Sequence, residues 1–512
     1  MTIKNISLFI LVSTILVSSN SFGAKGDLDL NFGDGSIPAT SVLWYPTPCG
    51  IDDSDIEVTA KDFALNSNNI YVSLSLSEKI TFKPRGDAVV KLDLNGKLDK
   101  SFASNGFYCE TDNIQMLVTD DKNNLLVIEP HISASGTNIG NRRGVAISRL
   151  NDKGQLDENF GYQGKTGAYW SYEPSSGPGF GLISNIKQLD NEDFKITGHI
   201  LYPSLAIHPF EFESSQEGKT PSITRFSNQV SGEQNAGGQG AVILGNGDWF
   251  QTLSSYKTLS PEELVYKTFV RKFFSNGDID INFGINGDLS LAPETISFEP
   301  IQMTETRYQK LLVLGKSYLL NDSDNRFIRI NSLGYDGILD DQFANNGSLE
   351  IKLPNQKLTT NENEREIALS SILVTQSDEI LTSIFYRQTI SDNTDSNIFR
   401  ENKLNILMAT DSNGVILNDI FTNGIKDLGI SFDTRQMLQQ KDGRVLLLGT
   451  CAVGSNRVFC LQRINWDNKS EIAPVSPTAN SGGGSITHLF VLFGIIIFRL
   501  RKETSKLNRL KK

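Results

Sequence analysis

Two histidines and one lysine stand at the ends of predicted strands in three different parts of the chain. His131 closes the run LLVIEPHI, His199 closes FKITGHI, and Lys316 follows LLVLG in a third run. If these strand ends meet at one rim of the fold, their side chains form a polar pocket near its axis, and the three residues become candidate ligand-binding groups. The competing interpretation is that they are exposed residues at strand ends with no ligand.

A second pattern with chemical content is D-x-D-x-N, which occurs as DLDLN and as DIDIN. This spacing begins an EF-hand calcium loop, which also requires glycine at its sixth position and glutamate at its twelfth. Here the sixth position is phenylalanine, and the twelfth is Pro38 or Leu289. The pattern therefore favours a turn, with calcium binding as the alternative. The residues of that alternative are Asp27, Asp29, Asn31, Asp278, Asp280 and Asn282.

The common catalytic motifs are missing from this sequence. It contains no G-x-S-x-G, no H-E-x-x-H, no phosphate-binding loop and no G-x-G-x-x-G that opens a helix. The sequence therefore predicts no catalytic residue, no metal beyond the calcium alternative and no cofactor. The net charge of -11, from 59 acidic and 48 basic residues, argues against nucleic-acid binding, which needs a basic surface.

A phrase of eleven residues, which the chain repeats, must position any such site. Its clearest copy is GQLDENFGYQG, from Gly154 to Gly164. Its glycines permit positive φ in tight turns, and its aspartate can accept backbone N–H groups as an Asx turn. Its leucine and phenylalanine are expected to be buried between neighbouring sheets. The phenylalanines of the six copies are Phe32, Phe102, Phe160, Phe283, Phe343 and Phe421.

Between the copies, apolar and polar residues alternate with period two, and no long helical stripe occurs. Each unit of the repeat contains a hairpin-like strand pair, an alternating strand, the phrase and a further strand. Seven such strand pairs can be counted, and one copy of the phrase has decayed near Thr224–Gly238. We therefore predict an all-β fold, a β-propeller of seven four-stranded blades over residues 24–470. Six or eight blades are the alternatives.

The two ends of the repeat region complete one another. The chain begins with a phrase that lacks its strand pair, and it ends with a strand pair and the strand FCLQRIN, whose phrase is missing. We expect the N-terminal strand to pair with the last blade, because a closed ring leaves no long sheet edge open.

Residues 1–23 have the pattern of a secretory signal peptide, with Lys4 before the apolar run Ile6–Val17 and cleavage after Gly23. Export permits disulfides, and the chain has four cysteines. Cys451 and Cys460 flank a predicted hairpin tip and are expected to pair. That pairing joins Cys49 to Cys109, although three pairings of four cysteines are formally open.

The C-terminal segment consists of a Pro/Ser/Gly linker, residues 471–485, and a short apolar stretch with a basic end, residues 486–512. The apolar run Ile486–Leu500 is shorter than the roughly 20 residues of a spanning helix. Triple glycine, apolar stretch and basic end together resemble the GlyGly-CTERM sorting tail of Gram-negative bacteria. That resemblance implies removal by a rhomboid-type protease near Gly482–Ser485, followed by lipid attachment or release at the cell surface. A periplasmic protein with a retained inner-membrane anchor is the alternative.

The phrase, preceded by a strand that ends in RLN or RIN, resembles the delta-60 repeat of bacterial surface and secreted proteins. The segments Gln439–Gly449 and Ser148–Gly164 match it best, and the resemblance covers most of Gly26–Trp466. It departs in the middle unit and in three copies whose phenylalanine is followed by Ala or Thr. The family implies a propeller-like β fold and no settled activity.

Three functions remain open from the sequence. The first is an exported binding module for a protein or glycan partner. The second is an extracellular propeller hydrolase or lyase that acts on polysaccharide, with its site on the axis. The third is a structural protein of the cell envelope. Membrane contact is expected only through the C-terminal tail or a lipid that replaces it.

Overall fold

A computed structural model describes most of one compact unit, Met1–Asn468. The described residues are 24–33, 40–42, 49, 56–78, 81, 83–111, 113–133, 142–170, 180–201, 207–218, 222–225, 234–236, 240–260, 263–293, 295–320, 322–353, 362–392, 399–429, 432–453 and 456–467. The predicted signal peptide, the linker and the tail lie outside them. No helix in this part of the chain is long and apolar enough to cross a membrane.

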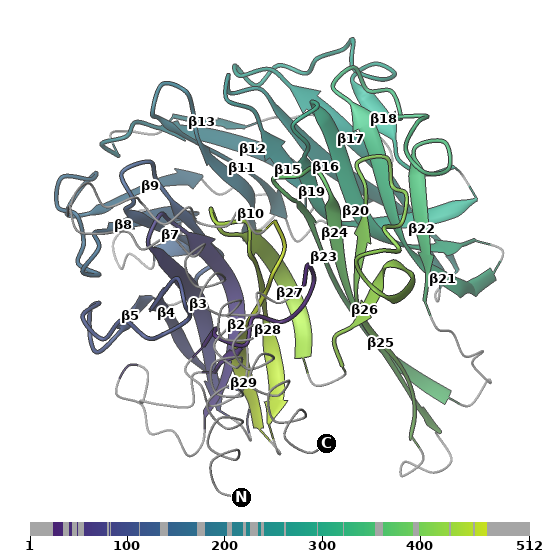
Figure 1. Ribbon diagram of the computed structural model, residues 1–512. Coiled ribbons are helices and arrows are strands. Elements are labelled where there is room, and N and C mark those ends of the chain that lie inside the picture. The colour runs from purple at the N-terminus through teal and green to yellow at the C-terminus, as the bar shows by residue number, and fades with distance from the viewer. Residues whose placement is uncertain are drawn as a thin grey trace, which may run out of the picture. The chain divides into compact units, whose positions relative to one another are not determined.

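The described strands form seven antiparallel sheets, which we number as blades 1–7 (Figure 1). Blade 1 contains β2 (Ile56–Leu65), β3 (Asn69–Glu78), β4 (Pro84–Asp93) and β5 (Phe107–Thr111); blade 2 contains β6 (Met116–Thr119), β7 (Leu125–Ser133), β8 (Arg142–Leu150) and β9 (Lys165–Trp170); blade 3 contains β10 (Phe180–Gln188), β11 (Phe194–Leu201), β12 (Ile207–Ser214) and β13 (Ser222–Arg225). Blade 4 contains β14 (Gln234–Ala236), β15 (Ala241–Ile243), β16 (Trp249–Ser260), β17 (Glu263–Phe273) and β18 (Asp288–Ser290), and its first two strands both pair with β16.

The remaining three sheets have the same order. Blade 5 contains β19 (Ile296–Glu305), β20 (Lys310–Leu319), β21 (Asp322–Gly334) and β22 (Ser348–Lys352); blade 6 contains β23 (Glu362–Val374), β24 (Ile380–Asp392), β25 (Phe399–Thr410) and β26 (Ile425–Asp427); blade 7 contains β27 (Phe432–Gln439), β28 (Val445–Val453), β29 (Asn456–Ile464) and β1 (Thr40–Val42). A short 3-10 turn, η3 (Thr422–Gly424), precedes β26. The predicted all-β propeller of seven blades is therefore confirmed.

The ring closes as the two incomplete ends of the sequence predict. β1, from the start of the chain, pairs with β29, from its end, and Val42 lies opposite Cys460. The N-terminal strand thus becomes the outermost strand of blade 7. This pairing covers the outer edge of β29, so that the main-chain donors and acceptors of β29 opposite β1 are not left open.

Five of the six phrases connect the third and fourth strands of a blade, and the first phrase precedes β1 and lies beside the end of β29. The phenylalanine of each phrase is buried between its blade and the next. Phe160, for example, packs among Leu126 and Ile128 of blade 2 and Phe194 and Ile196 of blade 3. All six phrase phenylalanines are at most 8% exposed. The apolar cores of the protein are therefore the interfaces between sheets, which explains why the phrase repeats once for each blade.

Five of the six phenylalanine rings also pack against the opening glycine of the following unit. A Cβ atom on Gly96 would lie 2.6 Å from Cζ of Phe32, and Gly96 has φ +81°. Phe421 of the last phrase covers Gly26 of the first in the same way, which closes the circle. Gly218 takes this place against Phe160. The decayed copy of the phrase therefore opens at Gly218, before the segment that the sequence indicated.

Both expected disulfides form. Cys49 is bonded to Cys109 on β5, and Cys451 on β28 is bonded to Cys460 on β29. No described cysteine is free. The first bond involves the outermost strand of blade 1, and the second joins the second and third strands of blade 7. Together they suit a protein that folds in an oxidising compartment.

Candidate functional site

The three ligand-binding candidates from the sequence lie on the second strands of their blades. His199 is on β11, 4% exposed, and it shares one face of that strand with Lys195 and Thr197. Burial lowers the pKa of His199 to about 4, and its Nδ1 has no hydrogen-bond partner among the described residues. Lys316, on β20, lies opposite Glu299. His131 is at the far end of β7, opposite Gly144.

Neither His199 nor Lys316 lines the axial channel or the smaller cavity described below. His199 and Lys316 occupy equivalent positions in their blades. Each is paired with a residue of the first strand that lies just before a register shift in that strand. His199 and Lys316 are therefore at equivalent points of the repeat, and strand order places this point one strand away from the axis. A ligand-binding role for the three residues stays a prediction.

The aspartates of the calcium alternative have protein partners. Oδ1 of Asp29 accepts the N–H of Asn31, which makes the expected Asx turn, and its Oδ2 accepts Arg463. Burial acts to raise the pKa of Asp29, but the charge of Arg463 and the hydrogen bonds to the carboxylate hold this pKa below its usual value. Asp280 repeats this arrangement with Asn282 and Lys272. Among the described residues, no three His, Cys, Asp or Glu side chains gather as metal ligands would.

The largest cavity that we describe lies on the axis of the ring, where the inner strands of all seven blades meet. Its volume is about 570 Å³. The inner strands surround it because each blade places its first strand innermost. The polar side chains on its wall are Lys61, Asp62, Thr119, Ser184, Asn185, Ser370, Gln302, Arg435, Gln436 and Gln439. We call this cavity the axial channel.

Irregularities in the inner strands direct four of the side chains that line the axial channel, three polar and one apolar. The register of the inner strand shifts by one residue at Lys61, Ser184, Ile301 and Arg435, in blades 1, 3, 5 and 7. A bulge of this kind leaves one residue unpaired and turns its side chain away from the regular alternation. All four residues line the axial channel.

The residues beside these bulges join neighbouring blades around the axis. In three blades, a side-chain oxygen accepts a main-chain N–H of the next inner strand: Asp62 from Leu117 at 2.7 Å, Gln302 from Ile372 at 3.0 Å and Gln436 from Phe63 at 3.3 Å. Gln115 does the same for Ile183, and Asn185 donates to the carbonyl of Ala241. Five of the seven junctions therefore carry one such bridge.

Asp62 is the single acid among the described residues of this ring of amides. Burial raises its pKa to about 6, and hydrogen bonds from Leu117 and Gln436 offset only part of that effect. Lys61, next to it in the chain, is bonded to Asp87 at 2.7 Å. Arg435, from blade 7, donates to the carbonyl of Ala60 at 3.0 Å. The channel wall thus combines two cations, one carboxyl group that titrates near pH 6, and several amides and hydroxyls.

Sequence reasoning missed this site. The available signal was a polar pair before the apolar residues of the inner strand, Lys61-Asp62 in one unit and Arg435-Gln436 in another. Its meaning depends on strand order, because the first strand of a blade is not marked as innermost by its own sequence.

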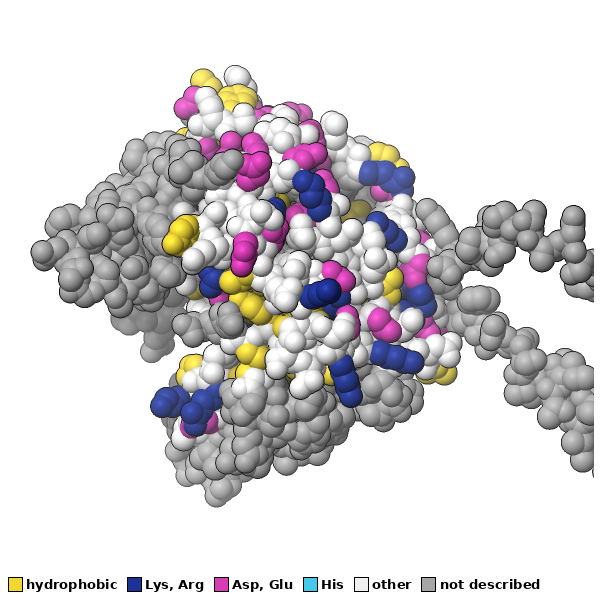
Figure 2. Space-filling view, turned by 90° about the vertical axis from the view of Figure 1, so that its left-hand side faces the viewer, with side chains coloured by type: hydrophobic (Ala, Val, Ile, Leu, Met, Phe, Trp, Pro, Cys, Tyr) yellow, Lys and Arg dark blue, Asp and Glu magenta, His cyan; other side chains and the backbone are white. Residues whose placement is uncertain are grey.

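The phrases also carry exposed apolar side chains at the positions that vary between copies. Leu30, Tyr162, Ile281 and Ile285 are between 71% and 81% exposed. On the face seen in Figure 2, acidic and basic side chains of the described residues are interspersed.

No protein-family model and no curated protein matches the sequence. Several solved structures are similar over much of the chain. A protein of unknown function from Dyadobacter fermentans is 12% identical, with 68% of this chain and 93% of that one covered and a TM-score of 0.34. An ulvan lyase is 10% identical, with 86% and 95% covered and a TM-score of 0.37. Trypanosoma rangeli sialidase is 9% identical, with 72% and 59% covered and a TM-score of 0.33. Values this low carry no argument about what this chain does.

Proposed function

We propose that the protein is an exported binding propeller that holds a glycan in its axial channel. The observation that carries this proposal is the cavity of about 570 Å³, walled by all seven inner strands. Its size falls within the range of small-ligand pockets. Its amides, hydroxyls and cations provide donors and acceptors for a ligand that is rich in hydroxyl groups.

A glycan array with residues 24–480 tests the proposal. Ser184→Trp is the matched variant, because Ser184 lies at a bulge and its replacement fills the channel from blade 3. Tyr162→Ala is the control, since Tyr162 is 79% exposed on an outer loop. We expect binding that Ser184→Trp abolishes and Tyr162→Ala leaves unchanged. An array without signal, or binding that survives Ser184→Trp, would contradict the proposal.

Polysaccharide hydrolysis or lysis is the second candidate, and Asp62 favours it. A carboxyl group with a pKa near 6 inside a cavity has the properties of a general acid or base. Retaining and inverting glycosidases use two carboxyl groups, however, and Asp62 is the single one on the described channel wall. A reducing-end assay on a bound glycan tests this candidate. If reducing ends are released and Asp62→Asn abolishes their release, the protein is a catalyst and not a binding module.

The proposed export rests on the signal-peptide pattern, on the tail that resembles a GlyGly-CTERM signal and on the two disulfides. The mature product is then expected to lack residues 1–23 and the basic C-terminal end. The intact mass of the protein released from cells measures this. A product that retains Arg499–Lys512 would contradict processing of the tail and favour the anchored, periplasmic alternative.

A further inference from the structure

A basic residue on the third strand of a blade usually pairs with the aspartate of the following phrase. Four blades have this pair, each between 2.7 and 3.1 Å: Lys91–Asp99, Arg149–Asp157, Lys272–Asp280 and Arg463–Asp29. In three of them, the same side chain crosses to a main-chain carbonyl of the next blade, from Lys91 to Asp152, from Arg149 to Gln216 and from Arg463 to Leu94. The basic side chain therefore fills the junction between the outer parts of two blades.

Blade 5 has serine at this position. Ser332 accepts the N–H of Asp340 through its main chain, as Lys91 accepts that of Asp99. The cation for Asp340 comes instead from Lys310 on the second strand, 2.5 Å away. Because the serine side chain is too short to cross to blade 6, its hydroxyl stays with the carboxylate of Asp340 at 3.3 Å.

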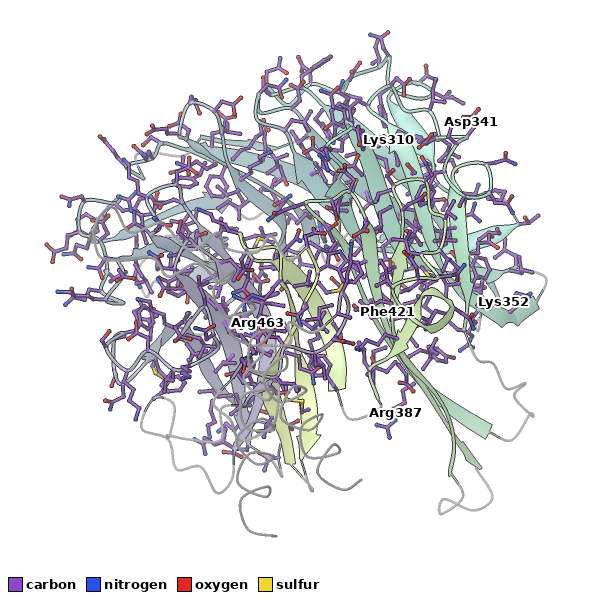
Figure 3. All side chains as sticks on the ribbon, viewed as in Figure 1. Lys310, Asp341, Lys352, Arg387, Phe421 and Arg463 are labelled. Atoms are coloured by element: carbon purple, nitrogen blue, oxygen red, sulfur yellow. A yellow bond between two sulfur atoms is a disulfide. The ribbon has the colours of Figure 1, made fainter. Side chains whose placement is uncertain are left out.

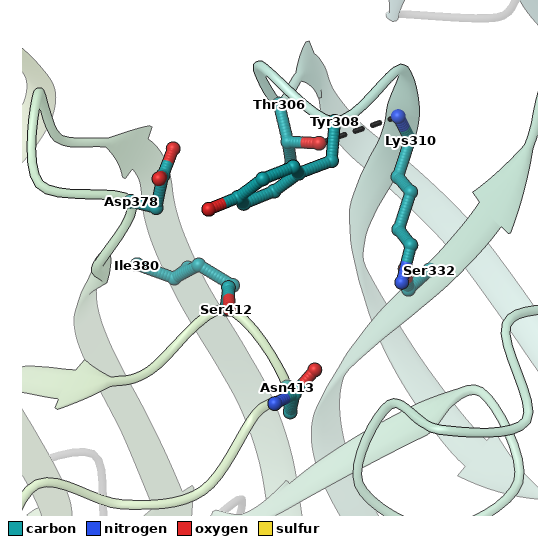
Figure 4. A pocket seen from close by; sticks show the side chains of 8 residues that line it. All are labelled: Thr306, Tyr308, Lys310, Ser332, Asp378, Ile380, Ser412 and Asn413. Atoms are coloured by element: carbon teal, nitrogen blue, oxygen red, sulfur yellow. Dashed lines mark hydrogen bonds between the residues drawn. The ribbon is translucent and has the colours of Figure 1, made fainter.

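A cavity of about 310 Å³ occupies this junction between blades 5 and 6. Ser332 and Lys310 lie on its blade 5 side. Ser412 and Asn413, which directly precede the last phrase, form its floor in the view of Figure 4. Asn413 corresponds to Lys153 in blade 2, since both main-chain carbonyls accept an N–H of the preceding phrase. We call this cavity the blade 5–6 pocket.

The walls of the blade 5–6 pocket offer one aromatic ring and several polar groups. Tyr308 is 60% exposed, and Figure 4 shows its hydroxyl directed toward Asp378 across the opening. An exposed tyrosine presents a flat apolar face and a polar tip at a low cost in side-chain entropy. The polar groups opposite it are the amide of Asn413 and the hydroxyls of Ser332 and Ser412. Sugar rings combine apolar C–H faces with equatorial hydroxyls, which these groups complement.

Each charged side chain that lines the blade 5–6 pocket already has a partner of opposite charge. Lys310 faces Asp340, and Asp378 is bonded to Arg307. An ionic ligand would have to compete with these pairs, whereas an uncharged one would not. The volume lies near the lower limit for ligand sites, so the pocket accommodates a single ring and not an oligosaccharide.

We infer that the blade 5–6 pocket binds one pyranose ring of an uncharged glycan. The inference rests on the proposed function for the class of ligand, and it adds a site separate from the axial channel. Ser332 makes the site by omission, because the basic residue that four other blades have at this position would occupy the space.

Saturation-transfer NMR on the mature protein tests the inference. The probes are the methyl pyranosides of glucose, galactose, mannose and N-acetylglucosamine. At least one is expected to receive saturation from the protein. Ser332→Lys restores the residue that blade 1 has at this position, and Tyr308→Ala removes the ring. Each should weaken the affinity for that probe by about tenfold or more. Tyr162→Ala removes a tyrosine of similar exposure from another blade and is the matched control.

Two results would overturn the inference: no transfer to any of the four probes, or transfer that persists in both Ser332→Lys and Tyr308→Ala. Ser184→Trp separates the two sites. A signal lost in Ser184→Trp and kept in Ser332→Lys would place the ring in the axial channel, so that the proposed function stands and this inference fails. The reverse pattern supports the blade 5–6 pocket and leaves array binding at the channel to be judged by its own experiment. Melting temperatures of all variants establish that each protein is folded.

Discussion

The guanidinium of Arg463 (Figure 3), near the end of the described chain, is bonded to the carboxylate of Asp29, near its start, with 2.9 Å between Nε and Oδ2. Both side chains are at most 8% exposed. The same guanidinium lies over the ring of Phe32, 4.6 Å from its centre. This ion pair therefore adds a charged contact to the strand pairing that closes the ring.

Replacing Arg463 by Met should weaken this closure, because it leaves Asp29 buried with only Arg444 as a cationic partner. Loss of one member of a buried pair costs about 3 kcal/mol or more. We expect a fall of about 3 kcal/mol in the free energy of unfolding, measured with urea. Lys25→Met is the control, since that lysine is one-third exposed and exposed pairs are worth at most about 1 kcal/mol. Equal losses in both variants would contradict a special role for Arg463.

Replacing Phe160 by Ala should open a cavity between blades 2 and 3, because the ring is fully buried there. A buried phenylalanine replaced by alanine costs roughly 3–5 kcal/mol. Tyr162, two residues later in the same phrase, is 79% exposed. Its replacement by Ala is expected to change stability by no more than about 0.5 kcal/mol. Urea unfolding of both variants measures the contrast. If Phe160→Ala loses no more free energy of unfolding than Tyr162→Ala, the Phe160 ring is not buried between the blades.

Replacing Asp62 by Asn should make stability less sensitive to pH. Burial raises the pKa of Asp62 to about 6 from an unfolded value near 4, so the folded state resists ionisation. The stability that the protonated form provides is present below pH 4 and is lost as pH rises through 6. Asn keeps an acceptor for Leu117 and cannot ionise. From pH 4 to pH 7.5, the free energy of unfolding of the wild type should fall by roughly 3 kcal/mol relative to that of Asp62→Asn. Equal pH profiles would contradict the raised pKa.

Replacing His199 by Gln should have the opposite pH dependence. Burial lowers the pKa of His199 to about 4, so the unfolded chain takes up the proton first as pH falls. The stability from neutral His199 is present above about pH 6.5 and is lost as pH falls through 4. Between pH 7 and pH 4 the wild type should therefore lose roughly 3 kcal/mol more than His199→Gln. Urea unfolding at both pH values tests this, and a shift in the same direction as that of Asp62→Asn would contradict it.

The architecture of this protein could be predicted from its sequence. Six interfaces between blades bury a phrase phenylalanine, such as Phe160 or Phe283, and the seven strand pairs between the copies of the phrase indicated seven blades. The incomplete first and last units indicated a closed ring, because an unpaired edge strand is costly to leave open. The disulfide between Cys451 and Cys460 followed from a hairpin of short span.

The positions of the cavities depend on the packing of the blades and could not be predicted from the sequence. Asp62, Asn185 and Gln436 are far apart in the chain and come together because the first strand of each blade is innermost, with bulges that set the direction of neighbouring side chains. Ser332 is an unremarkable residue in a list of repeats. It opens a pocket because the side chain that it replaces lies between two blades, a location that depends on the packing of whole sheets and not on local sequence.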